Sequence, residues 1–245
     1  MTKGTRKTKA GKSKTGLIAR PETEERTHAP VAYAKTGLEL LEAQPDDIVL
    51  DIGCKGGWLE YQLHQKVKKM VGVDMDAPFI AENNKINKYH NISYEVADVS
   101  HQLPFADNTF TKVALFEVLE HIPPKTEPRA LAEIYRVLKP GGTLVLTTPH
   151  ANWLSTILDP AWWFLGHRHY RADSLAKMLH QVGYQPIQIF IKGRMWHALS
   201  VFFYYPMRLV RIEKLTAGFM PRLVQREFNR GAGFVHLIVT ATKPR

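Results

Sequence analysis

Short apolar runs of six or seven residues recur along the chain, and most are followed by a stretch whose apolar residues have helical spacing. We predict strands at 48–53, 69–74, 92–97, 112–118 and 143–149, with helices at 58–67, 78–88 and 127–138. A further helix at 171–182 and two late strands at 185–192 and 234–242 complete the pattern. Alternating strands and helices at this spacing are typical of an α/β fold with a doubly wound, mostly parallel sheet.

Two segments depart from this alternation. Residues 1–28 are rich in Lys, Thr and Gly and hold few large apolar side chains, so we expect a disordered basic tail followed by one folded domain over 29–245. Residues 194–232, between the two late strands, are aromatic and basic and are long for a connection inside a compact domain. We expect this insertion to form helices of its own.

Composition and charge narrow the setting. The chain has 245 residues, 44% of them hydrophobic, and a net charge of +10 that resides in the tail, the insertion and the last few residues, while 21–191 are net acidic. The single cysteine, Cys54, excludes an internal disulfide and a cysteine-cluster metal site, and no other metal site is expected. The longest nearly apolar run, 195–207, is too short to span a bilayer. We therefore expect a cytoplasmic protein, with a peripheral membrane contact left open.

The stretch VLDIGCKGGWLE (49–60) places a glycine-rich turn between a strand and a helix, where nucleotide-like ligands bind in doubly wound sheets. Neither a phosphate-binding Gly-Lys-Ser/Thr nor a G-x-G-x-x-G pattern is present. Acids end three of the strands: Asp51, Asp74 and Asp98. Asp74 follows Gly53 at the offset at which an acid reaches a ribose, and Asp51 beside the turn suits a cation better than a pyrophosphate. The expected ligand contains a ribose and carries positive charge.

Five motifs in order point to one family. VLDIGCKGG, VGVDMD, VADVSHQLPFADNTF, FEVLEHI and VLKPGGTLVLTTP, within residues 46–150, resemble the successive motifs of class I S-adenosylmethionine-dependent methyltransferases. The resemblance is strongest to small-molecule enzymes typified by ubiquinone- and menaquinone-biosynthesis methyltransferases. It implies a methyltransferase with S-adenosyl-L-methionine as cofactor. It also implies a Rossmann-like sheet of seven strands in which the last strand inserts antiparallel.

The resemblance also assigns cofactor-binding residues. They are Asp51, Gly53 and Gly57 under the methionine part, Asp74 on the ribose diol, Met75 on the adenine face, Asp98 and Val99 at the adenine edge, and Phe116 and Glu117 beside the cofactor. For each of the three acids a plain role in capping a turn or helix is the alternative. The family usually has a second glycine where this chain has Lys55, whose side chain we expect in solvent.

Methyl transfer is an in-line displacement, so the enzyme mainly positions its reactants. A hydroxyl nucleophile also benefits from a base that titrates near neutrality, which favours histidine. Histidines on loops after strands are His121, His150, His167 and His169; the candidate catalytic residues are His121, His150 and His169, and the sequence does not choose among them. Glu120 and His121 have an alternative, structural role in hydrogen-bonding the turn before Pro123.

The acceptor is less well defined. Three tryptophans lie in 151–166, within the segment 151–170 where the resemblance places a lid over the substrate. Together with the insertion they predict a hydrophobic small-molecule or lipid-like acceptor, methylated at oxygen, or a surface that contacts an anionic membrane. Packing of these aromatic residues on the sheet is the plain alternative. An RNA or protein acceptor and a non-catalytic S-adenosylmethionine-binding module also stay open; the basic tail favours nucleic acid, whereas FEVLEH lacks the Asn/Asp-Pro-Pro-aromatic signature of base methylation.

Overall fold

The computed structural model describes residues 31–209 and 219–245, with side chains described up to 203 in the first range. The basic tail and the middle of the insertion lie outside the described residues. Seven strands of the described chain form one sheet: β1 (Ile48–Ile52), β2 (Lys69–Asp74), β3 (Ile92–Val96), β4 (Phe110–Phe116), β5 (Leu138–Pro149), β6 (Ile187–Lys192) and β7 (His236–Thr242). Their order is β3-β2-β1-β4-β5-β7-β6, and β7 runs antiparallel to both neighbours. The predicted strands and the antiparallel last strand are confirmed.

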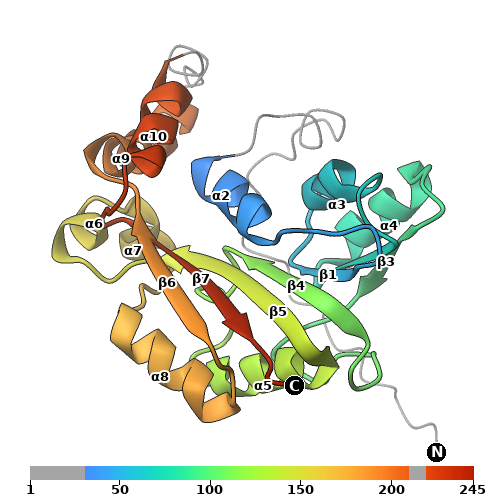
Figure 1. The fold of residues 1–245 in the computed structure, drawn as a ribbon. Helices are drawn as coiled ribbons and strands as arrows, with labels where there is room; N and C mark the ends of the chain where they lie inside the picture. Colours follow the sequence, from blue (N-terminus) through green and yellow to red (C-terminus); the bar gives the residue numbers. More distant parts are fainter. Residues whose placement is uncertain (1–30, 210–218) are drawn as a thin grey trace, which may run out of the picture.

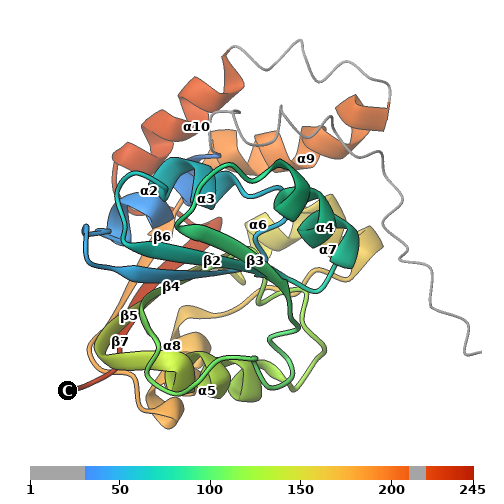
Figure 2. The ribbon, with the colours of Figure 1, turned by 90° about the vertical axis from the view of Figure 1, so that its right-hand side faces the viewer.

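Helices cover both faces of the sheet (Figures 1 and 2). On one face lie α5 (Glu127–Val137) and α8 (Ala172–Val182), and on the other lie α2 (Ala32–Leu40), α3 (Trp58–Leu63) and α4 (Ala77–Ile86). Neighbouring strand residues point to opposite faces, so Val49 belongs to the core under α3 and Leu50 to the core under α5. This burial on both faces explains why the strands read as almost continuous apolar runs.

Four more helices lie near one end of the sheet. α6 (Trp153–Ile157) and α7 (Pro160–Leu165) form the lid segment, and the insertion contributes α9 (Met195–Leu209) and α10 (Met220–Asn229). α7 packs against α9, and α10 packs against both α9 and α2 (Figure 1). The insertion therefore has helices, as predicted, whereas the two short lid helices were not predicted.

The insertion leaves and rejoins the sheet through a narrow neck. The backbone N–H of Phe234 donates to the carbonyl of Gly193 at 2.8 Å, and that of Gly233 donates to the carbonyl of Ile191 at 2.6 Å. A Cβ on Gly233 would collide with the backbone of Gly193, so the two chains can approach this closely because glycine stands there.

One helix end differs from expectation. The pattern predicts a helix to residue 138 that stops at the glycine pair, but α5 ends at Val137 and Leu138 is already extended and paired with Phe110 of β4. Gly141, with φ of 81°, lies inside the bent start of β5 instead of capping the helix. Pairing with a neighbouring strand, which a local pattern does not report, ends the helix early.

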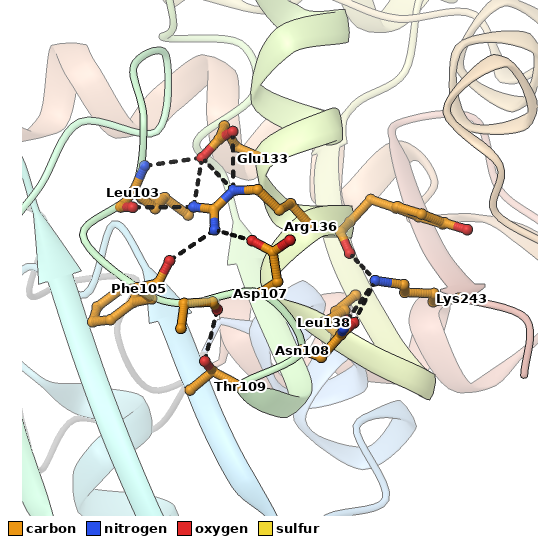
Figure 3. Close-up of polar contacts among 11 residues, drawn as sticks. Leu103, Phe105, Asp107, Asn108, Thr109, Glu133, Arg136, Leu138 and Lys243 are labelled. Atoms are coloured by element: carbon orange, nitrogen blue, oxygen red, sulfur yellow. Dashed lines mark hydrogen bonds and ion pairs between the residues drawn. The ribbon is translucent and has the colours of Figure 1, made fainter.

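A polar network stabilises the edge of the sheet where the parallel strands begin (Figure 3). The Arg136 guanidinium of α5 donates to two carboxylates and two loop carbonyls: Glu133, Asp107, Leu103 and Phe105. Lys243, just after β7, donates to the side chain of Asn108 and to the carbonyls of Tyr135 and Leu138 at 2.8–2.9 Å. These contacts tie the loop before β4 to α5 and to the end of β7, at the edge opposite the candidate site.

Candidate active site

The glycine turn connects β1 to α3 at the carboxyl edge of the sheet. Gly53, Lys55 and Gly57 have φ of 80°, 42° and 75°, the left-handed region that favours glycine. A Cβ on Gly53 would also collide with the side chain of Val118, at the end of β4. Lys55 adopts the backbone conformation expected of the glycine it replaces, and its side chain is exposed, as predicted.

Two acids border this turn. The Asp74 carboxylate accepts the N–H of Lys55 at 3.1 Å and that of Asp76 at 2.9 Å, so it fixes the turn from the end of β2. Asp51 is buried on β1, and its burial, followed by the negative charge of Asp74, raises its pKa to about 7. A buried carboxyl beside a second carboxylate is poorly stabilised as an anion, and a cation between them relieves this. The residues therefore fit the positively charged, ribose-containing cofactor that the motifs imply.

The expected adenine side is mixed. Met75 is 72% exposed beside Asp74, open to contact with a flat ligand. Asp98 accepts the N–H and the hydroxyl of Ser100 at 2.8 and 2.7 Å, and it lies 3.1 Å from Nδ1 of His101. Although burial opposes ionisation, these hydrogen bonds lower the pKa of Asp98. The Val99 side chain is buried in the core, so it offers no side-chain contact to a ligand.

The end of β4 carries the next two predicted residues. The half-buried Phe116 ring packs on α2, where a Cβ on Gly37 would lie 2.7 Å from the ring. Glu117 has φ of 55°, and its carboxylate accepts the hydroxyl of Thr147 at 2.8 Å and lies 2.9 Å from Nε2 of His236. Burial raises the pKa of Glu117 to about 7. The Glu117 carboxyl therefore gains or loses its proton near pH 7, and it lies where β4, β5 and β7 meet.

His236, at the start of β7, was not predicted as a site residue. Its ring stacks between Tyr33 and His197 with centroids 4.8 Å apart on each side, and burial lowers its pKa to about 3. Its Nδ1 is buried without a hydrogen-bond partner among the described residues. The ring also lines a cavity of 30 Å³ under α6 and α9. No local signal marks this histidine, because it reaches Glu117 through the pairing of distant strands.

The loop after β4 holds a second polar group. Glu120 is buried and accepts the hydroxyl of Thr148 at 3.1 Å; burial and the nearby Glu117 raise its pKa well above the usual range. His121 is half exposed, and its ring meets that of His167 edge-on at 4.5 Å. Burial and the positive charge of His167 lower the pKa of His121 to about 4, so its imidazole is neutral near pH 7.

The other two predicted histidines are more fully engaged. His169 places Nε2 2.9 Å from the Asp159 carboxylate and Nδ1 3.0 Å from the Thr156 hydroxyl, so both ring nitrogens contact the lid. Burial opposes ionisation of Asp159, but contacts with His167 and His169 outweigh it and lower its pKa. His150 places Nδ1 3.0 Å from the carbonyl of Phe234.

Arg168 and Tyr170 hold the loop that carries Glu120 and His121, and neither was predicted. The Arg168 guanidinium donates to the carbonyls of Leu119, Glu120 and Ile122 and to the carboxylate of Glu127. The Tyr170 hydroxyl donates to the carbonyl of Leu119 at 2.9 Å. The lid segment thus fixes the backbone on which His121 lies.

Large apolar side chains are exposed on the lid and on α9. Among them, Trp153 is 74% and Phe164 84% exposed, which argues against simple packing of the lid aromatics on the sheet. We call the exposed apolar side chains of the lid and α9 the aromatic surface; besides Trp153 and Phe164 it comprises Ile157, Trp162, Trp163, Leu165, Met195, Trp196, Phe202 and Phe203. Within the described residues, no helix has the length and apolarity needed to cross a bilayer.

Comparisons with known proteins agree with these features. Residues 50–146 match the family model of a methyltransferase domain. The mitochondrial ubiquinone biosynthesis O-methyltransferase of Rattus norvegicus is 34% identical over 119 residues, which are 45% of this chain and 33% of that protein. The ubiquinone/menaquinone biosynthesis C-methyltransferase UbiE of Desulfotalea psychrophila is 36% identical over 108 residues, which are 42% of this chain and 43% of that protein. The matches thus span less than half of either curated relative.

The fold likeness covers more of the chain. A chain in the solved complex between the Haloferax volcanii Trm112 methyltransferase activator and the putative methyltransferase has a TM-score of 0.64 at 17% identity, over 91% of this chain and 92% of that chain. These findings confirm the predicted fold class, the resemblance to class I methyltransferases and S-adenosylmethionine as the cofactor of that domain type.

Proposed function

Because residues 50–146 are a methyltransferase domain of the class I, S-adenosylmethionine-dependent type, we propose that the protein methylates an oxygen of a hydrophobic small-molecule or lipid-like acceptor. The observation that carries this proposal is the position of two polar groups where the strand order reverses, between β1 and β4. Asp51 and Asp74 border the glycine turn, and Glu117, Glu120 and His121 follow β4. The first group suits a cationic cofactor and the second suits proton transfer.

The acids and the turn would hold the cofactor, which when bound supplies a methyl group on a positively charged sulfur. The buried Asp51 gains most from a ligand cation, since its own surroundings disfavour its charge. Asp74 keeps acceptor capacity beyond its two backbone bonds, enough for a ribose hydroxyl. Met75 offers an exposed apolar side chain to the adenine ring of the cofactor. The Asp98 carboxylate is already used by Ser100, so its contribution to an adenine contact is the smallest.

His121 is the histidine that we assign to the acceptor's proton. Its lowered pKa, about 4, makes it a weaker base than a histidine that titrates near neutrality, but its imidazole is neutral near pH 7 and able to accept a proton, and half of its side chain is open to solvent. His169 is tied on both ring nitrogens, and His150 on one. Arg168 holds the loop at three carbonyls, so the imidazole would keep its place as the acceptor approaches.

The acceptor class is inferred from the aromatic surface defined above. A small polar substrate would need no exposed tryptophans beside the lid, whereas a lipid-like one would meet them on entry. The same surface favours a peripheral contact with a membrane, because tryptophan side chains suit the headgroup boundary, and the exposed arginines of α10 add attraction to anionic lipids. The nucleic-acid alternative drew on the tail, which lies outside the described residues, and stays a prediction.

Two measurements test this function. Calorimetry with S-adenosylmethionine and S-adenosylhomocysteine should show binding that Asp74→Ala weakens by about 1–3 kcal/mol, through loss of a charged hydrogen-bond acceptor. Asp173→Ala, which removes an exposed carboxylate on α8, is the control and should change nothing. Comparison of extracts from a deletion strain and its parent should reveal a hydrophobic metabolite that lacks one O-methyl group. Unchanged cofactor affinity in Asp74→Ala, or a change confined to nucleosides, would refute the proposal.

A further inference from the structure

The base of the insertion is organised around one buried acid. Glu227 of α10 accepts the backbone N–H groups of Arg194, Trp196 and His197 at 2.9–3.0 Å. It therefore caps the first turn of α9 from the neighbouring helix and compensates the unpaired amides and the positive end of the helix dipole there. Because three backbone N–H groups already donate to the Glu227 carboxylate, it has less capacity to pair with the arginines around it.

Beside this cap lies a pocket of about 200 Å³. Its lining residues are Arg194, Trp196, Leu223, Arg226, Glu227 and Arg230. Arg226 on α10 and Arg230, the residue directly after that helix, are exposed. Arg194 donates from its Nε to the carbonyl of Ala232 at 2.8 Å. The pocket thus gathers three guanidinium groups around a single carboxylate that is held by backbone amides.

We propose that this pocket binds the phosphate of a phospholipid headgroup and docks the protein on an anionic bilayer. Guanidinium groups match phosphate oxygens in charge and in paired hydrogen-bond geometry. The pocket lies at the start of α9, and Trp196 both lines it and is 44% exposed.

The choice of a lipid over a free phosphate follows from what surrounds the pocket. Beyond it, Phe202 and Phe203 continue the exposed apolar side of α9, and α7 with Trp163 and Phe164 packs beside that helix. Exposed aromatic side chains next to arginines are the arrangement that a headgroup boundary favours, with rings below the phosphates and cations at their level. A site for a soluble phosphate would need only the arginines.

Docking in this way would bring the lid to the bilayer surface. The 30 Å³ cavity, lined by Leu158 and Asp159 of the lid segment, Val201 of α9 and His236, lies behind the aromatic surface. This cavity is large enough for only about one or two water molecules, so it is not the acceptor's route; docking would instead place the aromatic surface where a lipid-like acceptor meets the protein. This inference rests on the proposed function for the acceptor, but the binding of the headgroup itself does not.

The test is co-sedimentation with vesicles of neutral phosphatidylcholine and with vesicles that also contain phosphatidylglycerol, at low salt and at about 0.15 M salt. Wild type should pellet with the anionic vesicles. The double variant Arg226→Gln/Arg230→Gln should bind them roughly thirtyfold more weakly, as expected from losing two surface cations. The matched control is Arg222→Gln, an exposed arginine one turn earlier on α10 that does not line the pocket, and it should change binding less than threefold.

Three outcomes would overturn the inference. One is wild-type protein that stays in the supernatant with anionic vesicles at low salt. Another is an equal loss in Arg222→Gln, which would indicate diffuse attraction instead of a pocket. The third is binding of inorganic phosphate, measured by calorimetry, with no vesicle binding, which would make the site one for a soluble anion. Melting temperatures of the variants should match wild type, so that loss of binding is not loss of fold.

Failure of this inference and failure of the proposed function are distinguishable. Asp74→Ala should lose cofactor affinity and still pellet with anionic vesicles. The double arginine variant should keep cofactor affinity, because its pocket is on α10 while the cofactor residues follow β1 and β2. A further variant, Trp163→Ala/Phe164→Ala, should weaken vesicle binding at both salt concentrations, since its apolar contribution is not screened.

Discussion

Cofactor affinity should rise with pH, because Asp51 must ionise to meet a cation. Its pKa is raised to about 7 by burial and then by the charge of Asp74, from an ordinary value of 3.8. If only the ionised form binds, roughly 1% of the unliganded protein is competent at pH 5 and roughly three quarters at pH 7.5. The dissociation constant should therefore fall by roughly 50–100-fold across this range, about 2.5 kcal/mol.

The measurement is titration calorimetry with S-adenosylmethionine between pH 5 and 7.5, a range over which the amino group of the ligand, with an ordinary pKa of about 7.7–8.0, stays mostly protonated. Asp51→Asn removes the titration and should bind weakly with a flat pH profile. Asp98→Asn is the matched control: the pKa of Asp98 is lowered, so this variant should keep the wild-type slope. Wild-type affinity independent of pH, or an unchanged slope in Asp51→Asn, would refute the assignment of Asp51 to the ligand's charge.

Two buried carboxyls should contribute the opposite trend to the stability of the unliganded protein. Asp51 and Glu117 keep their protons in the folded state up to about pH 7, whereas in the unfolded chain they release them near their ordinary values of 3.8 and 4.5. Between these limits the unfolded state binds fewer protons at these two carboxyls, so their contribution to the free energy of unfolding should fall as pH rises from about 4 to 7. His121 and His236, whose pKa values are lowered, contribute with the opposite sign, so the fall is measured as the difference between wild type and the double variant Asp51→Asn/Glu117→Gln. Bound cofactor should restore part of this stability, so unfolding with and without cofactor gives a second measurement of the ionisation of Asp51 and Glu117.

Two further predictions separate the site from its scaffold. Arg168→Gln should lower kcat roughly tenfold or more, because the 119–122 loop loses the side chain that holds it, while cofactor affinity measured by calorimetry should stay within twofold. An unchanged kcat, or an equal loss in the exposed control Arg171→Gln, would contradict this role. Arg136→Ala should lower the free energy of unfolding, measured in urea, by about 2–4 kcal/mol, because two carboxylates and two loop carbonyls lose their donor. Cofactor affinity should not change. A loss below about 0.5 kcal/mol would show that the network in Figure 3 contributes little to stability.

The fold was readable from the sequence because strands buried on both faces appear as apolar runs, and the acids that end them stand out. Asp51 and Asp74 were found in this way, and the structure places both at the glycine turn. His236 was not found, because its partner Glu117 is 119 residues away and only the antiparallel pairing of β7 with β5 brings them together.

The histidines show a different limit. His121 and His169 have the same side chain and similar loop settings in the sequence, but Asp159 and Thr156 occupy both nitrogens of His169. Which of them is available to a substrate depends on these tertiary partners, and a local pattern does not report them. The two lid helices were missed because they are five and six residues long, which is too short for helical periodicity to be recognised in the sequence.

The antiparallel course of β7 makes the acceptor side of this fold modular. Because β6 ends and β7 begins at the same edge as the carboxyl ends of the parallel strands, whatever chain joins them is delivered to the rim of the site. The two chains of the insertion meet at Gly193 and Gly233, so the segment beyond them joins the sheet at one narrow place. The cofactor residues of β1 and β2 lie away from that neck, whereas Glu117 after β4 contacts His236 at the start of β7. Exchange of this one segment would therefore change the acceptor side while the residues of β1 and β2 keep their places, and within the described residues it reaches the site through the packing of α10 on α2 and the stacking of His197 on His236.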